Sequence, residues 1–285
     1  MLKAFNNSML KLIFFIKNII SELIYTFKFL RNNHHTIKKL KNSKQDKNVI
    51  LLGNGNSVNL LSTKKILNLQ KKNFDLIATN NFLSSSLSKK IVPNFYVMSD
   101  ERTINPILYK KELKNISIQN YKASIKTINN LNKLKNIKLF LPSELNKKHN
   151  FKIKIYYFNN FKNYYKKQFI DLRYSNNLYP ITGLNALRIC VYLGYKKIYI
   201  AGIDNDHWKS VLVNQKNTIF SRGKYFYDKN YKLSKSNIKN ISDYLMVWIK
   251  IFESYDLFKK FNIINLNPKS YITTFKKKHY LDIYK

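Results

Sequence analysis

The sequence predicts an α/β fold built on a doubly wound, mostly parallel β-sheet. From residue 47 onward, short apolar runs rich in β-branched and aromatic residues alternate with stretches of helical periodicity. This alternation is typical of a parallel sheet covered by helices on both faces. The runs are apolar throughout, as expected of strands whose two faces are both buried. The predicted strands are residues 49–52, 76–79, 95–98, 137–141, 197–201 and 263–266, and the predicted helices are residues 57–70, 183–193 and 237–261.

A basic amphipathic helix is expected to precede the sheet. Residues 1–32 have helical apolar spacing interrupted by Lys11, Lys17, Glu22 and Lys28. The longest apolar run is far shorter than the roughly 20 residues that span a bilayer. The pattern fits a helix lying in a membrane interface, or a helix packed on the domain or on a partner. Residues 33–47 are polar and basic, so we expect a helix and linker over 1–47 and one domain over 48–285.

The composition indicates a foldable and very basic chain. Its 285 residues are 45% apolar and carry a formal net charge of +37, a value that fits nucleic acid or an anionic membrane as partner. The lysines are spread along the whole chain, and they accompany Asn, Ile, Tyr and Phe, which AT-rich genomes favour together. We therefore expect no nucleic-acid partner. Attraction to an anionic membrane or to a phosphorylated substrate stays open.

Cysteine usage points to a reducing compartment. Cys190 is the only cysteine, so the chain has no intrachain disulfide and no cysteine-based metal site. It lies in an apolar helical pattern and is expected in the core. No signal peptide is apparent, which favours a cytoplasmic protein at the inner face of the plasma membrane.

Small polar residues follow the predicted strands at their carboxyl ends, where open α/β sheets bind their ligands. The candidate binding residues at these ends are Gly53, Asn54, Gly55, Asn56, Ser57, Asn80, Asn81, Ser99, Asp100, Asp204 and Asp206. We expect them to converge on one crevice.

The turn G-N-G-N-S at residues 53–57 is the first of these strand ends. Gly53 would permit a tight turn, and Gly55 would let the backbone approach a ligand closely. Ser57 could cap a helix starting at Val58, whose N–H groups would then face a phosphate. The turn matches neither the dinucleotide fingerprint nor the Walker loop. The alternative is a purely structural turn.

Two further segments belong to the predicted crevice. Thr182 is an apt N-cap for the helix that starts at Gly183, and it could serve a ligand or the cap alone. Asp204 and Asp206 could bind a metal or a substrate group, or could form only an Asx-turn. His207 is the one histidine near a predicted strand end of the core, which makes it the candidate general base.

Residues 203–236 show little helical periodicity. A stretch of this length in a compact domain is usually functional, so we expect a lid. Tyr225 and Tyr227 lie there near Arg222 and Lys224, a cluster that could close over a sugar or base. The alternative is a small satellite core under a long loop.

Three segments carry a resemblance to a known family. They read V-I-L-L-G-N-G-N-S-V, F-D-L-I-A-T-N-N-F and I-T-G-L-N-A-L-R-I-C-V-Y-L-G-Y-K-K-I-Y-I-A-G-I-D. They are similar to the bacterial sialyltransferases of glycosyltransferase family 42, the Campylobacter and Haemophilus type. The closing segment F-N-I-I-N-L-N-P-K-S is also similar to that family's final strand and proline-containing loop, and the matched segments are scattered between about residues 48 and 275.

The resemblance implies a single Rossmann-like domain with a lid, which transfers sialic acid from CMP-sialic acid without a metal. The turn at residues 53–57 would face the CMP phosphate and ribose, Asn80 the nucleotide or donor sugar, and Thr182 the donor carboxylate. The loop after Asp204 and the lid tyrosines would handle the leaving phosphate.

The chain departs from the family pattern at two points. Asn56 replaces the proline of the family's G-N-G-P-S turn, which is a mild change. Residues 210–240 contain no histidine, although the family's general base lies in this part of the lid. Either His207 has taken over that role, or the chain is not a sialyltransferase. The absent histidine also favours a third hypothesis, a catalytically inactive nucleotide-sugar-binding protein.

A second group has the same skeleton. The stretch P-N-F-Y-V-M-S-D at residues 93–100 and the strand L-G-Y-K-K-I-Y-I-A-G-I-D resemble proteins similar to archaeal 6-hydroxymethylpterin diphosphokinase. In that interpretation Asp100, Asp204 and Asp206 would hold Mg²⁺ for phosphoryl transfer from ATP.

The first hypothesis is therefore a membrane-associated glycosyltransferase that uses a CMP-activated donor and a cell-surface glycan acceptor, without a cofactor. His207 would deprotonate the acceptor hydroxyl, while Tyr225, Tyr227 and backbone N–H groups stabilise the departing phosphate. The alternatives are a pyrophosphokinase that uses ATP and Mg²⁺ and an inactive binding protein.

Overall fold

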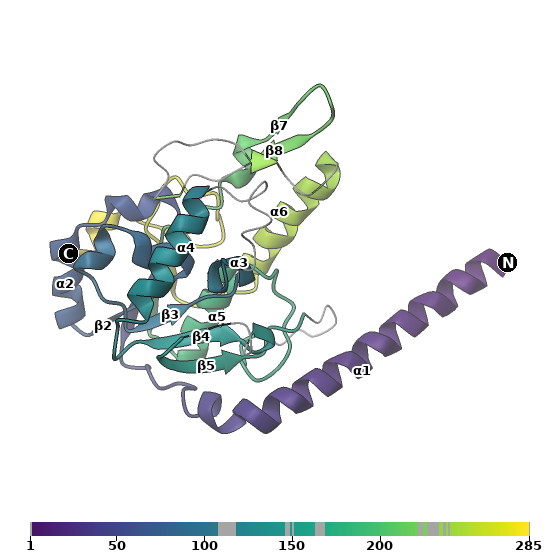
Figure 1. Cartoon of the computed structure of the whole chain (residues 1–285), viewed down its shortest axis with the longest axis horizontal. Coiled ribbons are helices and arrows are strands. Elements are labelled where there is room, and N and C mark those ends of the chain that lie inside the picture. The colour runs from purple at the N-terminus through teal and green to yellow at the C-terminus, as the bar shows by residue number, and fades with distance from the viewer. Residues whose placement is uncertain are drawn as a thin grey trace.

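A computed structural model confirms the predicted Rossmann-like α/β architecture (Figure 1). It describes residues 2–107, 118–145, 149, 151–162, 169–221, 225–226, 234–235, 238 and 240–284. Within them, an eight-stranded sheet has the order β11-β10-β6-β1-β2-β3-β4-β5, and its neighbours pair in parallel. The strands are β1 (Asn48–Leu52), β2 (Phe74–Thr79), β3 (Phe95–Val97), β4 (Lys138–Pro142), β5 (Lys154–Phe158), β6 (Lys197–Ala201), β10 (Ile263–Asn265) and β11 (Lys276–Lys277).

The strand order reverses beside β1. Strands β1 to β5 follow one another towards one edge, and the chain then returns to place β6 on the free side of β1. At the carboxyl end of β1, Leu52 pairs with Ala78 of β2 on one side and with Ala201 of β6 on the other. The chain connections from β1 and β6 run in opposite directions across the sheet at this point, which is where doubly wound folds bind their ligands.

Helices cover both faces of the sheet, and β1 shows why. Val49 and Leu51 point into one hydrophobic cluster, whereas Ile50 and Leu52 point into the other. The first cluster includes residues of α5 (Thr182–Leu193) and α6 (Ile241–Asp256), and the second includes residues of α2 (Thr63–Lys71) and α4 (Ile118–Leu131). The apolar runs are therefore strands buried on both faces, as predicted.

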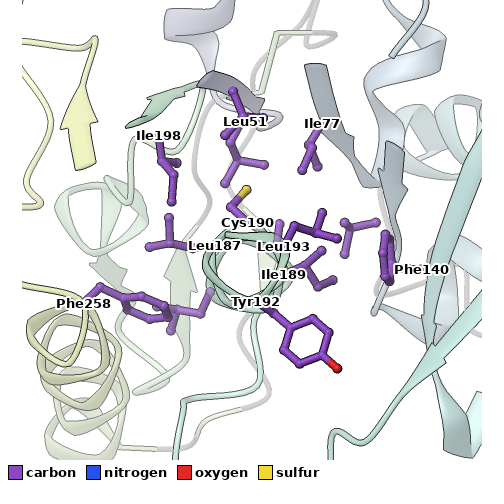
Figure 2. Packing of buried hydrophobic residues seen from close by; sticks show 14 of the residues in the cluster. Leu51, Ile77, Phe140, Leu187, Ile189, Cys190, Tyr192, Leu193, Ile198 and Phe258 are labelled. Carbon is purple, nitrogen blue, oxygen red and sulfur yellow. The ribbon is translucent and has the colours of Figure 1, made fainter. Parts of the chain in front are cut away.

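The helix α5 is the centre of the first cluster. Figure 2 views it end-on, with Cys190 directed towards Leu51 and with Ile189 and Leu193 on neighbouring positions. Cys190 is fully buried, as expected, and burial raises the pKa of its thiol well above the ordinary value. The helix ends at Gly194 with φ +83°, the left-handed conformation that favours glycine at this position.

All six predicted strands are present, but some helix boundaries differ from the prediction. The segment after β1 is a short 3₁₀ helix, η1 (Asn56–Leu60), and α2 begins only after a break. The helix α6 is shorter than predicted because Asn240 caps it, its side-chain oxygen accepting the N–H of Asp243 at 2.8 Å. The strand β5 was not predicted, since its segment lies in the lysine- and aromatic-rich part of the chain that has no clear period.

The N-terminal helix α1 (Leu2–Lys38) is longer than the predicted helix. The turns that follow it pack on the domain: the N–H groups of Asn42 and Lys44 donate to the carbonyls of Tyr192 and Leu193 at 3.0 and 2.9 Å. Lys44 also forms a 3.0 Å ion pair with the buried carboxylate of Asp75 on β2. Within the described residues, no helix combines the length and apolarity that crossing a bilayer requires.

The segment predicted as a lid folds in part into a small antiparallel sheet. It consists of β7 (Leu212–Val213), β8 (Ile219–Ser221) and β9 (Ser234–Lys235), after the 3₁₀ helix η6 (His207–Ser210). The short helix α3 (Glu101–Ile104) follows β3. Several residues of the lid segment, Arg222, Lys224 and Tyr227 among them, lie outside the described residues.

Candidate functional site

A pocket of about 200 Å³ lies at the point where the strand order reverses. It is lined by residues 53–55, 79–80, 181–183 and 202–207, together with Tyr225, Trp248, Ile251 and Tyr255. These segments are the loops after β1, β2 and β6, the start of α5, and one side of α6. Ten of the predicted site residues line it: Gly53, Asn54, Gly55, Asn80, Thr182, Gly183, Asp204, Asp206, His207 and Tyr225.

The two glycines of the G-N-G-N-S turn allow the loop after β1 to lie against the loop after β6. A Cβ atom on Gly53 would overlap the carbonyl of Gly202, and one on Gly55 would overlap the carboxylate of Asp204. The N–H groups of Gly53 and Gly55 donate to the carbonyls of Ala201 and Gly202, at 2.8 and 2.6 Å. Contact between loops, rather than approach of a ligand, thus explains both glycines.

Ser57 does not cap a helix, which corrects the prediction. Gly55 occupies the N-cap of η1, and the Ser57 hydroxyl donates to the carboxylate of Asp204 while accepting the N–H of Gly202 at 3.0 Å. The charged carboxylate is the stronger acceptor, so the side chain turns towards it. The N–H of Ser57 also donates to Asp204, at 3.0 Å, and is therefore not offered to a phosphate.

Asp204 joins three strand ends. Besides the two bonds from Ser57 after β1, its carboxylate accepts the side-chain amide of Asn267 after β10, at 2.8 Å. Asp204 itself follows β6 and is 8% exposed. A buried carboxylate with three donors is well satisfied by the protein alone, and its oxygens are largely committed to holding the loops together.

A chain of polar side chains links the starts of three other segments. Asn80, in the left-handed region at φ +41°, donates from its amide to the Thr182 hydroxyl at 3.0 Å. The Thr182 hydroxyl also bonds to that of Ser99, at 2.8 Å. Ile181 rather than Thr182 occupies the N-cap of α5, a second correction. Thr182 is the first helical residue, and its hydroxyl bonds to the residues that follow β2 and β3, Asn80 and Ser99, instead of capping the helix.

Four buried polar atoms of the pocket lining have no hydrogen-bond partner in the described part of the chain. They are the side-chain oxygens of Asn54 and Asn80, the side-chain nitrogen of Asn205 and the hydroxyl of Tyr255. The side chains of Asn205 and Tyr255 lie near each other in the pocket. Each such group costs about 1–3 kcal/mol when left unpaired. Other buried polar atoms of the described residues also lack a partner, but a polar ligand in the pocket would complete these four.

His207 lies in the pocket lining between two aromatic side chains. Its ring centroid is 5.5 Å from that of Tyr225 and 5.4 Å from that of Trp248. The backbone carbonyl of His207 accepts the Tyr244 hydroxyl at 3.3 Å, which ties this position to α6. Beside it, partial burial and then the charge of Asp204 raise the pKa of Asp206 above its ordinary value.

The remaining predicted residues do not line the pocket. Asn56 is exposed on η1, and Asn81 is buried with its oxygen accepting a hydroxyl of α4. Asp100 is the exposed N-cap of α3. Ser99 does not line the pocket itself, but its hydroxyl bonds to that of Thr182, which does. Tyr227 lies outside the described residues.

The aspartates do not fit the magnesium site of the pyrophosphokinase hypothesis. Asp100 lies outside the pocket, and Asp204 is engaged by Ser57 and Asn267. Over the described ranges, no three His, Cys, Asp or Glu side chains are grouped closely enough to hold a metal ion.

Sequence reasoning missed the contribution of α6. Trp248, Ile251 and Tyr255 share one helical face through i, i+3 and i+7 spacing and form one wall of the pocket. The helical periodicity of the sequence predicted α6, but it did not show which face of this helix lies against the carboxyl ends of the strands. Asn205 was not predicted as a site residue, although its neighbours Asp204 and Asp206 were and although it lies just after β6.

Comparisons with known proteins give limited information. No model of a protein family matches the chain, and neither does any curated protein. Among solved structures, the chain is similar to the MAf glycosyltransferase from Magnetospirillum magneticum AMB-1, with a TM-score of 0.49 and 11% identity. The match covers 84% of this chain and 34% of that protein, so the chain spans about a third of its length. The resemblances to family 42 and to the pterin diphosphokinase group stay predictions from the sequence.

Proposed function

We propose that the chain is a glycosyltransferase that moves a sugar from a CMP-activated donor to the hydroxyl of a glycan acceptor. The observation that carries this proposal is the set of unpaired polar atoms gathered with His207 in the pocket at the strand-order reversal. The resemblance of the G-N-G-N-S and I-T-G-L-N segments to family 42 supports the nucleotide class.

The pocket holds the reacting end of the donor. Its volume of about 200 Å³ is below the roughly 300–1,000 Å³ of common ligand sites, so a whole nucleotide sugar extends beyond it. The side-chain oxygens of Asn54 and Asn80 accept donor hydroxyl or amine hydrogens. The start of α5 at Thr182 and Gly183 attracts the donor's negative charge, because a helix N-terminus carries a partial positive charge.

His207 takes the proton of the acceptor hydroxyl as this oxygen attacks the anomeric carbon. The bond between that carbon and the phosphate oxygen breaks, and CMP leaves with the electron pair. Attack from the face opposite the leaving group inverts the anomeric configuration. Tyr225, whose ring contacts that of His207, stabilises the developing phosphate charge.

Two measurements test the proposal. Calorimetric titration with CMP and with ATP, each with and without EDTA, identifies the nucleotide: we expect CMP to bind independently of EDTA. Release of CMP from a CMP-sugar in the presence of an acceptor glycan tests turnover. ATP binding that disappears with EDTA would instead establish the pyrophosphokinase, and CMP binding without any turnover the inactive binding protein.

The variant His207→Gln tests the base. We expect unchanged CMP affinity and turnover about 10²–10⁴-fold lower. His149→Gln is the matched control, because His149 lies outside the pocket and bonds to the Tyr157 hydroxyl at 2.8 Å. Turnover of His207→Gln within threefold of the unmodified chain would exclude His207 as the base.

A further inference from the structure

The C-terminal half of α1 is attached to the domain by one face. Glu22 accepts a hydrogen bond from the Ser175 hydroxyl and is 5% exposed. The Tyr25 ring lies 5.2 Å from that of Phe161, and Phe29 and Ile37 are 3% and 1% exposed. The N-terminal turns extend away from the rest of the molecule (Figure 1). The helix is thus held along one side and uncovered along the other.

The uncovered side of α1 is strongly apolar. Nine large apolar side chains on it are 37–69% exposed: Met9, Leu12, Ile13, Ile16, Ile19, Ile20, Leu23, Ile24 and Phe27. At 3.6 residues per turn they fall within about 140° of the helix circumference, on the side opposite Glu22 and Phe29. The apolar stripe formed by these nine residues is about 27 Å long, from a rise of about 1.5 Å per residue. Scattered surface apolar residues do not form such a stripe.

The charges around the apolar stripe are all positive. Glu22 is the only acidic residue of α1, and it faces the domain rather than the solvent. Lys17 and Lys28 are exposed along one border of the stripe, and Arg31 is exposed just beyond its end. The complete chain, α1 included, has a formal net charge of +37. A second copy of the chain would bring like charges together along the stripe, whereas anionic lipid headgroups would neutralise them.

We propose that α1 lies in the interface of an anionic membrane, with the apolar stripe inserted among the lipids and the opposite face holding the domain. Lys17, Lys28 and Arg31 then contact the headgroups, because long basic side chains reach from an apolar face to a charged surface. This surface is separate from the nucleotide pocket, so it does not depend on the proposed sugar transfer.

Co-sedimentation of the full chain with vesicles tests the proposal. We expect binding to vesicles of phosphatidylglycerol and phosphatidylcholine, and much weaker binding to phosphatidylcholine alone. The triple variant Ile20→Gln, Leu23→Gln, Phe27→Gln removes the middle of the stripe and is expected to bind at least about 100-fold more weakly.

A matched control separates the stripe from general surface hydrophobicity. Val92→Gln, Ile107→Gln, Ile118→Gln changes three apolar side chains that are 51–67% exposed elsewhere, and we expect it to bind vesicles like the unmodified chain. Lys17→Gln and Lys28→Gln should each weaken binding about fivefold on anionic vesicles only. Circular dichroism and CMP affinity, which should be unchanged, show that each variant is folded.

Two results would overturn the proposal. One is vesicle binding by the triple variant that equals that of the unmodified chain. The other is the absence of vesicle binding in the unmodified chain. If sedimentation equilibrium then showed a lipid-free dimer that the triple variant abolishes, the stripe would be the contact between two copies.

Discussion

Replacement of Asp204 by Asn distinguishes a structural carboxylate from a ligand-binding one. The carboxylate accepts the N–H and the hydroxyl of Ser57 and the amide of Asn267. The amide of Asn has a single acceptor oxygen. In either orientation its NH₂ group faces at least one buried donor that previously had a partner, and the negative charge is lost.

The expected cost follows from these bonds. Hydrogen bonds to a charged group contribute about 1.5–3 kcal/mol, and an unsatisfied buried donor costs about 1–3 kcal/mol. Because Asp204 is 8% exposed, little solvent compensates. We expect the free energy of unfolding to fall by about 3 kcal/mol, which lowers the melting temperature by roughly 6–12 °C for a chain of this size.

Thermal and urea unfolding followed by circular dichroism measures the effect, with Asp206→Asn as the control. Asp206 is only partly buried, so we expect its variant to melt within about 2 °C of the unmodified chain. In a double-mutant cycle, Ser57→Ala combined with Asp204→Asn should cost about 1–2 kcal/mol less than the sum of the single changes, because the two residues share bonds. Unchanged melting of Asp204→Asn together with lost CMP binding would refute the reasoning and assign the carboxylate to the ligand.

Three further predictions follow from single residues. Asn80→Ala removes one unpaired oxygen from the pocket. We expect the affinity for the CMP-activated sugar, measured by calorimetry, to fall about fivefold to tenfold, and we expect the same fall with and without Mg²⁺. Burial alone would raise the pKa of Asp75, but hydrogen bonds from Tyr195 and Lys44 hold it below the ordinary value. The ionised Asp75 therefore contributes its full stabilisation of the fold above the unfolded pKa of about 3.9, and this contribution is lost as the pH falls through the lower folded pKa. In melting scans from pH 6 to 2, the melting temperature of the unmodified chain should fall more steeply with acid than that of Asp75→Asn. The buried thiol of Cys190 should resist iodoacetamide in the folded chain and react only in urea, as mass spectrometry would show.

The sequence was sufficient for six strands of the described sheet because each of those six is a mainly apolar run between polar turns. The same property explains why β5 was missed: its alternating burial and its lysines made it resemble the loops around it. The break between η1 and α2 was also missed, since an apolar period continues through Leu60 and Leu61. The shape of that turn depends on contacts with the loop after β6, among them the bonds of Ser57 to Asp204, 147 residues away.

For the site, the position of a residue just after a strand predicted well whether it lines the pocket. The sequence did not predict correctly what each of these side chains binds. Seven of the ten predicted residues that line the pocket lie just after strands of the parallel sheet, whose carboxyl ends meet at one edge, and the other three are Thr182 and Gly183 at the start of α5 and Tyr225 in the lid segment. The sequence could not show that Ser57 and Asp204 would satisfy each other, nor which face of α6 supplies Trp248 and Tyr255. Both depend on contacts between segments far apart in the chain.

The strand order of the sheet also determines when the site can exist. The side of β1 that β6 will cover is an open strand edge until residues 197–201 have been made, although β1 and β2 can pair at once. Such an edge attracts other unpaired strands, and closing a loop of this length delays folding. A nascent or truncated chain that ends before β6 therefore has no complete pocket and carries an open strand edge, so the pocket forms only after β6 has been made and has covered that edge.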